Sequence, residues 1–338
     1  MRSIYSQSLE RSCDHFNHQP HDFDAKTHHM RILFCTKKDV FGASILNWIL
    51  PRLGSHQVKV LLSDKTRTEE NSVQALVEEK FLERDLPLRA LFPLIDEHAS
   101  TATLATFEGC RQRYQVEIDT ISRINDPETE AMIREWAPDI IVSARFSLIF
   151  KANIESIPPL GIFNVHPGAL PGYAGLYAPL RGVLNADKDL GCTVHQVDEG
   201  IDTGAVYSVS YLPFKRERSI FGHIAQLYEL GLTSFLELLN DLEQGKPPAL
   251  NVQDASLFRY FKLPDEAVFA SLKTMGVELV AFEVYSEFMK QFVPEALLKR
   301  LSQVLSPEAL EQVTQQVNAV GIDATVLAFS KQLARSVR

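Results

Sequence analysis

Two polar residues at the end of an apolar stretch are the first candidates for chemistry. In "GIFNVHPGALPGYAG" (161–175), Asn164 and His166 stand two positions apart and precede a segment rich in glycine and proline. Residues two apart on a strand point to the same side, so both side chains would project together at the carboxyl end of the strand. In α/β sheets this is the edge where ligands bind.

A second polar group follows about thirty residues later. "GCTVHQVDEGIDTG" (191–204) alternates apolar and polar residues through His195 and then enters a loop with Asp198, Glu199 and Asp202. A carboxylate beside a histidine favours the imidazolium form. An amide, an imidazolium and a carboxylate around one point suit a reaction through a tetrahedral oxyanion, because the first two donate hydrogen bonds to the oxygen and the third handles a proton.

The same residues also have structural interpretations. A single histidine at a strand end is more often a structural residue, and an asparagine before a Gly/Pro loop is often only a turn former. His166 and His195 with Asp198 or Asp202 could ligate a metal, but no local ligand pair has the spacing of a metal site. His195, on an apparent strand, is interpreted as a structural residue or as one that supports the catalytic residues from behind, and not as a catalyst.

The elements that must position these residues alternate along the chain. Short apolar runs predict strands at 31–35, 57–64, 88–95, 116–121, 138–144 and 161–166. Amphipathic patterns predict helices at 41–53, 71–84, 100–113 and 126–136. This alternation predicts an α/β fold with a doubly wound, mostly parallel, Rossmann-like sheet that helices cover on both faces.

The character of the chain changes after residue 215. Residues 219–242 read as one long amphipathic helix, "EQGKPPALN" (243–251) is rich in helix breakers, and 265–337 shows helical periodicity with Pro264, Pro294 and Pro307 as helix starts. We therefore expect three parts. These are a flexible tail over 1–29, a catalytic domain over 30–215 and a helical C-terminal region over 216–338, which could mediate packing or a homodimer.

Composition and charge restrict the partners. The formal net charge of -9 gives no general attraction to nucleic acid. No apolar run approaches the roughly 20 residues needed to cross a bilayer. The four cysteines lack paired metal-ligand spacing and suit a reducing compartment. We expect a cytoplasmic protein that binds neither a membrane nor, by default, nucleic acid.

Three stretches together resemble the folate-dependent formyltransferase family, which includes glycinamide ribonucleotide, methionyl-tRNA and amino-sugar formyltransferases. They are "PDIIVSARFSLIF", "FNVHPGALPGYAGLYAP" and "GCTVHQVDEGIDTG", in that order and spacing, and the likeness spans about 30 to 215. The resemblance implies that Asn164, His166 and Asp202 are catalytic and that no metal is needed. It also implies that 10-formyltetrahydrofolate is the formyl donor. Its pterin would then lie against two loops, at Phe146, Leu148, Phe150, Asp198, Glu199, Gly200 and Ile201.

The sequence departs from that family at several points. "CTKKDVFGASIL" lacks the glycine-rich first turn with which the ribonucleotide enzyme holds its substrate phosphate. Gly168 stands where close relatives commonly carry serine, and Tyr207 where an aliphatic residue is usual; neither is expected to touch the catalytic residues. Methionyl-tRNA formyltransferases carry a C-terminal β-barrel, whereas 265–337 reads as helical.

The sequence thus predicts an N-formyltransferase acting on the amine of a small metabolite, such as an amino sugar or a nucleotide-linked amino sugar. Three alternatives stay open. A formyltetrahydrofolate hydrolase would use water in place of the amine, but such enzymes usually carry an N-terminal regulatory domain, for which 29 residues are too few. A methionyl-tRNA formyltransferase would need a surface that binds tRNA. A silent folate-binding protein would not need the three catalytic residues.

Overall fold

The computed structural model describes residues 29–54, 56–97, 102–294 and 297. The predicted flexible tail lies outside the described residues except for His29, as do the helices predicted after Pro294 and Pro307. The boundaries at 215 and 216 stay a prediction.

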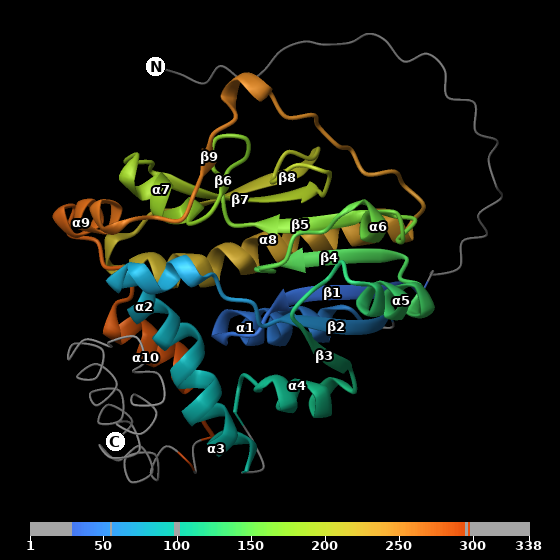
Figure 1. The fold of residues 1–338 in the computed structure, drawn as a ribbon, viewed down its shortest axis with the longest axis horizontal. Coiled ribbons are helices and arrows are strands. Elements are labelled where there is room, and N and C mark those ends of the chain that lie inside the picture. Colours follow the sequence, from blue (N-terminus) through green and yellow to red (C-terminus); the bar gives the residue numbers. More distant parts are fainter. Residues whose placement is uncertain (1–28, 55, 98–101, 295–296, 298–338) are drawn as a thin grey trace.

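A seven-stranded sheet forms the centre of the protein (Figure 1). Its order is β3-β2-β1-β4-β5-β7-β8, in which the neighbours from β3 to β5 are parallel and β7 and β8 are antiparallel to their neighbours. The strands are β1 (Arg31–Lys37), β2 (Gln57–Ser63), β3 (Glu117–Ile121), β4 (Ile140–Ala144), β5 (Ile162–His166), β7 (Asp189–Gln196) and β8 (Val206–Pro213). The strand order reverses between β1 and β4, which is where doubly wound sheets place their ligands. The predicted doubly wound, mostly parallel sheet is confirmed.

Helices cover both faces of this sheet. They are α1 (Val40–Ile49), α2 (Gln74–Lys80), α3 (Phe92–Asp96), α4 (Phe107–Tyr114), α5 (Pro127–Trp136), α6 (Ala152–Glu155), α7 (Ala178–Leu184), α8 (Ser219–Glu243), α9 (Glu266–Thr274) and α10 (Phe282–Lys290). The helix predicted over 100–113 begins only at Phe107, because the Thr106 side chain accepts the N–H of Gly109 and caps it there. None of the described helices is both long and apolar enough to span a membrane.

The strand predicted over 88–95 is wrong. This stretch is helical in the structure, as the turns Phe81–Asp85 and Pro87–Leu91 followed by α3. Leu88, Leu91, Phe92 and Ile95 are spaced i, i+3, i+4 and i+7, so a helix places them on one side. Of these, Leu91, Phe92 and Ile95 are buried. The short apolar run was interpreted as a strand, although its buried residues follow the spacing of a helix.

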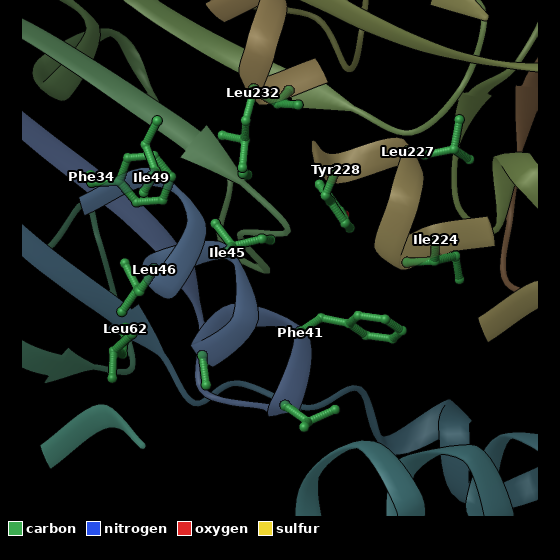
Figure 2. Close-up of a cluster of buried hydrophobic side chains, with 14 of the residues drawn as sticks. Phe34, Phe41, Ile45, Leu46, Ile49, Leu62, Ile224, Leu227, Tyr228 and Leu232 are labelled. Carbon is green, nitrogen blue, oxygen red and sulfur yellow. The ribbon is translucent and has the colours of Figure 1, made fainter. Parts of the chain in front are cut away.

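Two hydrophobic cores lie on opposite faces of the sheet. Along β1, Ile32 and Phe34 belong to one core while Leu33 and Cys35 belong to the other, which is the period of two that a doubly covered strand requires. The larger core joins α1 to α8. Phe41 and Ile45 of α1 face the α8 stretch from Ile224 to Leu232 (Figure 2). The smaller core lies under α5 and α6.

The described part of the C-terminal region contains the predicted helices, with an extended stretch between α8 and α9. α9 begins two residues after Pro264, where Asp265 caps it through the N–H of Val268. α10 packs against α8 (Figure 1), and its Tyr285 hydroxyl donates a 2.7 Å hydrogen bond to the Leu82 carbonyl. These helices therefore lie against the α/β part and are not a separate body.

α8 approaches the sheet closely at Gly231. A Cβ at this position would lie 2.5 Å from the Cys192 sulfur and 2.5 Å from a methyl group of Val165. These neighbours belong to β7 and β5, the two strands that carry the candidate site. The glycine thus allows the longest described helix to support the site directly.

Gly231→Ala should lower the free energy of unfolding by about 1 kcal/mol or more, because overpacking a tight contact outweighs the better helix propensity of alanine. Urea unfolding measures this. Gly172→Ala is the control, since its new Cβ would meet its nearest atom at 3.6 Å, and it should change stability by less than about 0.5 kcal/mol. A stabilised Gly231→Ala protein would contradict the close contact.

Candidate active site

A cavity of about 320 Å³ opens at the carboxyl edge of the sheet and contains the three predicted catalytic residues. Asn164 and His166 come from the end of β5, and Asp202 comes from the loop between β7 and β8. The His166 Nδ1 atom lies 3.7 Å from Asp202 Oδ2. The structure places Asn164 and His166 in the same cavity and brings Asp202 to the same point, while their catalytic roles stay a prediction.

Neighbouring groups fix the orientation of the Asn164 amide. The Ser143 hydroxyl donates a 2.8 Å hydrogen bond to Asn164 Oδ1. Asn164 Nδ2 then lies 3.1 Å from His195 Nε2. Because His195 Nδ1 donates to the Gln196 carbonyl at 2.9 Å, its Nε2 accepts from Asn164 in the neutral ring. One N–H of the amide is thus committed to His195, and the second can serve a ligand.

His195 belongs to the same cluster, where it supports Asn164 and Asp202, the second of the two roles that the sequence suggested. Its Nε2 atom lies 3.6 Å from Asp202 Oδ1, and its ring stands nearly perpendicular to that of His166. It lines the cavity and is buried. Antiparallel pairing explains this, because Asn164 lies directly opposite His195 in the register of β5 and β7.

Asp202 is held as a carboxylate. Burial alone would raise the pKa of its carboxyl, but His166, His195 and the Gly175 N–H outweigh burial and hold that pKa well below its usual range. The Gly175 N–H donates to Oδ2 at 2.7 Å, and the Asp202 backbone has a left-handed φ of 57°. The charge is therefore present at neutral pH between two imidazole rings.

Asp198 points elsewhere. Its Oδ1 atom accepts hydrogen bonds from the Thr203 hydroxyl at 2.6 Å and from the Gly200 N–H at 3.1 Å, so it closes the loop on itself. The sequence could not separate Asp198 from Asp202 by spacing. The structure places only Asp202 beside the two histidines.

The residues expected to bind the donor lie on two loops of the same cavity. Those that line it are Phe146, Leu148, Phe150, Asp198, Gly200 and Ile201. Phe146 and Phe150 stack with their ring centroids 5.4 Å apart. Glu199 is exposed and does not line the cavity. Ile149, which the sequence did not single out, is 56% exposed at the rim.

Gly168 touches His166, contrary to expectation. A Cβ on Gly168 would lie 2.6 Å from His166 Nε2 and 2.7 Å from the Tyr173 carbonyl. His166 Nε2 donates to that carbonyl at 2.7 Å. The glycine therefore leaves room for this ring position, which a serine would crowd. Tyr207, in contrast, donates to Asp241 and does not line the cavity, as expected.

A buried ionic network forms the floor of the cavity near α1. Arg145 Nε donates to Asp39 Oδ2 at 2.7 Å, and another nitrogen of Arg145 donates to Glu83. Asp39 Oδ1 accepts the Gly42 N–H at 2.9 Å. The N-terminus of α1, a position that can bind a phosphate in other proteins, is therefore capped by a carboxylate of the chain itself.

Two carboxyls of this network are hard to ionise. Burial raises the pKa of Glu79 to about 8, although the Tyr177 hydroxyl donates to it. Burial likewise raises the pKa of Glu83 to about 6 despite Arg145. Burial thus disfavours the charged form of both carboxyls. No sequence pattern marked these residues, because they lie in a helix with an ordinary charged face.

The segment after α8 also reaches the site. Gln253 Nε2 donates to the Asp202 carbonyl at 2.9 Å and to the Gly204 carbonyl at 2.7 Å. Tyr260 and Leu263 line the cavity. The sequence pattern indicated here only a stretch rich in helix breakers that ends at residue 251. Among the described residues, no group of three or more His, Cys, Asp or Glu side chains is arranged to hold a metal ion.

The known proteins that resemble part of this chain are formyltransferases. Residues 98–226 match the model of the formyl transferase family. Methionyl-tRNA formyltransferase from Nitrosococcus oceani is 33% identical over 143 residues, which cover 42% of this chain and 44% of the relative. The methionyl-tRNA formyltransferase from Dehalococcoides mccartyi is 31% identical over 157 residues, which cover 46% of this chain and 50% of the relative. This chain spans about half the length of the curated relatives it matches.

A sugar N-formyltransferase from Shewanella sp FDAARGOS_354 is among the similar solved structures, with a TM-score of 0.45 and 17% identity over 69% of this chain and 77% of that chain. The family model spans α4 to the start of α8 and includes β5, β7 and the loop of Asp202. The part of the chain that carries the candidate site therefore matches the formyl transferase family model.

Proposed function

We propose that the protein is a folate-dependent N-formyltransferase that moves a formyl group from 10-formyltetrahydrofolate to an amine. One observation carries this proposal: Asn164, His166 and Asp202 meet at one end of a ligand-sized cavity, inside the domain that matches the family model. An amide donor, an imidazole and an ionised carboxylate are the groups that such a transfer requires.

The reaction forms one bond and breaks one. The neutral amine attacks the formyl carbon, and the carbonyl oxygen becomes an oxyanion that accepts hydrogen bonds from Asn164 Nδ2 and protonated His166. Asp202 stabilises the imidazolium. The bond from the formyl carbon to N10 of the folate then breaks. One proton leaves the attacking nitrogen and one arrives at N10, so the products are a formamide and tetrahydrofolate.

His166 must change one partner during this reaction. Its Nε2 donates to the Tyr173 carbonyl, and its Nδ1 faces Asp202. A hydrogen bond from His166 to the oxyanion therefore requires the ring to release one of these groups when the ligands bind. Asn164 needs no such change, because only one of its two N–H bonds is used by His195.

The two ends of the cavity suit different ligands. The loops with Phe146, Leu148 and Ile201 offer apolar surface and backbone groups, and we assign this end to the pterin of the donor. The opposite end lies at the carboxyl ends of β1 and β2. Its cationic residues are Lys37, Lys65, Arg67, Lys80 and Arg84.

These cations favour an acceptor that carries an anionic group. Burial, followed by repulsion from Arg84 and Lys37, lowers the pKa of Lys80. Asp39 and Glu83 bond to Arg145, and burial disfavours the charged form of Glu79, which leaves Glu70 as the other carboxylate that lines this end. Because Asp39 caps α1, a phosphate would bind these side chains and not the helix N-terminus. A nucleotide-linked amino sugar therefore fits better than a neutral amino sugar.

Methionyl-tRNA is the second candidate acceptor, since the curated relatives carry that activity in their names. The formal net charge of -9 and the helices α9 and α10, which pack on the α/β part, favour the small metabolite.

Asp202→Asn should lower turnover by about a hundredfold or more, because it removes the charge that supports imidazolium while keeping the side-chain shape. Release of tetrahydrofolate measures turnover. Asp198→Asn is the matched control in the same loop and should affect turnover much less. A larger loss from Asp198→Asn than from Asp202→Asn would move the role to Asp198.

5-Formyltetrahydrofolate should raise the melting temperature, because it would bind the native cavity and not the unfolded chain. At a ligand concentration of 100 times the dissociation constant, binding should raise the free energy of unfolding by about 2.7 kcal/mol. Thermal melts with increasing ligand measure it, and Phe146→Ala should weaken the effect. An unchanged melt at every concentration would count against folate as the donor.

Lys80→Met should raise KM for a nucleotide-linked amino sugar about tenfold, with a smaller effect on KM for the free amino sugar, since a charge-assisted contact to phosphate contributes roughly 1.5–3 kcal/mol. Steady-state kinetics with both acceptors measure this. Lys246→Met is the control, because Lys246 pairs with Asp241 away from the cavity. Formylation of charged initiator tRNA, with both amino sugars inert, would make the second candidate correct.

A further inference from the structure

Residues 251–261, which we call the crossing segment, return from the end of α8 to the candidate site. Asn251 and Val206 at the start of β8 exchange two backbone hydrogen bonds of 2.8 Å. At its other end, β9 (Tyr260–Phe261) pairs in parallel with β6 (Ala174–Gly175), and Figure 1 shows the two side by side. The crossing segment is thus tied to the α/β part on both sides of the Asp202 loop.

Gln253 lies between these two ties and holds the backbone of that loop. Its Nε2 atom donates to the carbonyls of Asp202 at 2.9 Å and Gly204 at 2.7 Å. Both partners can only accept, so the NH₂ group of an amide suits this position and a carboxylate does not. The hydrogen bonds fix the turn in which Asp202 adopts its left-handed φ of 57°, a conformation that residues other than glycine seldom adopt.

The carboxylate of Asp202 reaches the same segment by a second route. Its Oδ2 atom accepts the N–H of Gly175, which lies in β6 and has a φ of 91°. A Cβ on Gly175 would lie 2.3 Å from the Phe261 carbonyl, so β9 packs directly against this residue. The backbone and the side chain of Asp202 are therefore both held by the crossing segment, one directly and one through Gly175.

We propose that Gln253 is a positioning residue for Asp202, and that its amide keeps the carboxylate between His166 of β5 and His195 of β7. These two histidines are the cationic partners found within 4 Å of the carboxylate in the described part of the chain. The effect on turnover rests on the proposed formyl transfer. The placement of the carboxylate does not, because it can be measured without substrate.

Two variants test the role. Gln253→Met keeps the length of the side chain and removes both donors, whereas Gln253→Glu keeps the shape and turns an oxygen toward two carbonyls. Gln244→Met is the matched control, because the Gln244 side chain donates to Asn240 at the exposed end of α8, away from the Asp202 loop. The full-length protein is used throughout. If Gln253→Glu does not fold, Gln253→Met alone tests the role.

The direct readout is the titration of the Asp202 carboxyl in the ligand-free protein, followed by ¹³C NMR. In Gln253→Met we expect this carboxyl to titrate at higher pH than in the wild type, because it moves away from the histidines. We expect kcat to fall about tenfold to a hundredfold, as a displacement of about 1 Å in a catalytic group can produce. Gln244→Met should match the wild type in both measurements.

The outcomes separate this inference from the proposed function. An unchanged Asp202 titration together with unchanged kcat in Gln253→Met would overturn the positioning role, and so would a lower melting temperature with an unchanged titration. A shifted titration in a protein that transfers no formyl group, even as wild type, would keep the positioning role and remove the proposed reaction.

Discussion

The carboxylate of Asp202 between His166 and His195 is the interaction on which the rest of the site depends. A buried charge is costly unless opposite charges and hydrogen bonds compensate it. Here the two rings and the Gly175 N–H supply that compensation, and they hold the pKa of the carboxyl well below its usual range. If the loop moved, both histidines would lose their shared partner.

The architecture supplies this arrangement from distant parts of the chain. β5 ends the parallel part of the sheet, and β7 returns antiparallel beside it, so that Asn164 stands opposite His195 and the loop after β7 passes the end of β5. α8 supports both strands at Gly231, where it touches them without an intervening side chain. The crossing segment then bonds to the loop through Gln253. The sheet, α8 and the crossing segment thus all act on the position of the Asp202 carboxylate.

Local sequence patterns predicted the parts of this architecture that depend on neighbouring residues. Strands β1 to β5 follow from short apolar runs, α8 follows from a period of about 3.6 residues, and the common direction of Asn164 and His166 follows from a period of two. The prediction of a strand at 88–95 was wrong because a short apolar run fits either a strand or a buried helix. Only the spacing from Leu88 to Ile95 indicates the helix.

The rest of the site depends on contacts between distant residues, which local patterns do not record. Gln253 meets Asp202 across 51 positions, and His195 joins the cluster only through its pairing with Asn164. The choice of Asp202 over Asp198 came from family resemblance, because both stand in one acidic loop. The contact of Gly168 with His166 was missed because a glycine gives no sign of what its absent side chain would touch.

The fate of the formyl carbon distinguishes formyl transfer to an amine from every other reaction at this site. The protein is incubated with 10-formyltetrahydrofolate labelled with ¹³C in the formyl group and with nucleotide-linked amino sugars, and the label is followed by NMR. We predict that the label appears as an N-formyl amide on the acceptor. Label that is released only as formate, or that stays on the folate with every amine, would contradict formyl transfer to an amine at this site.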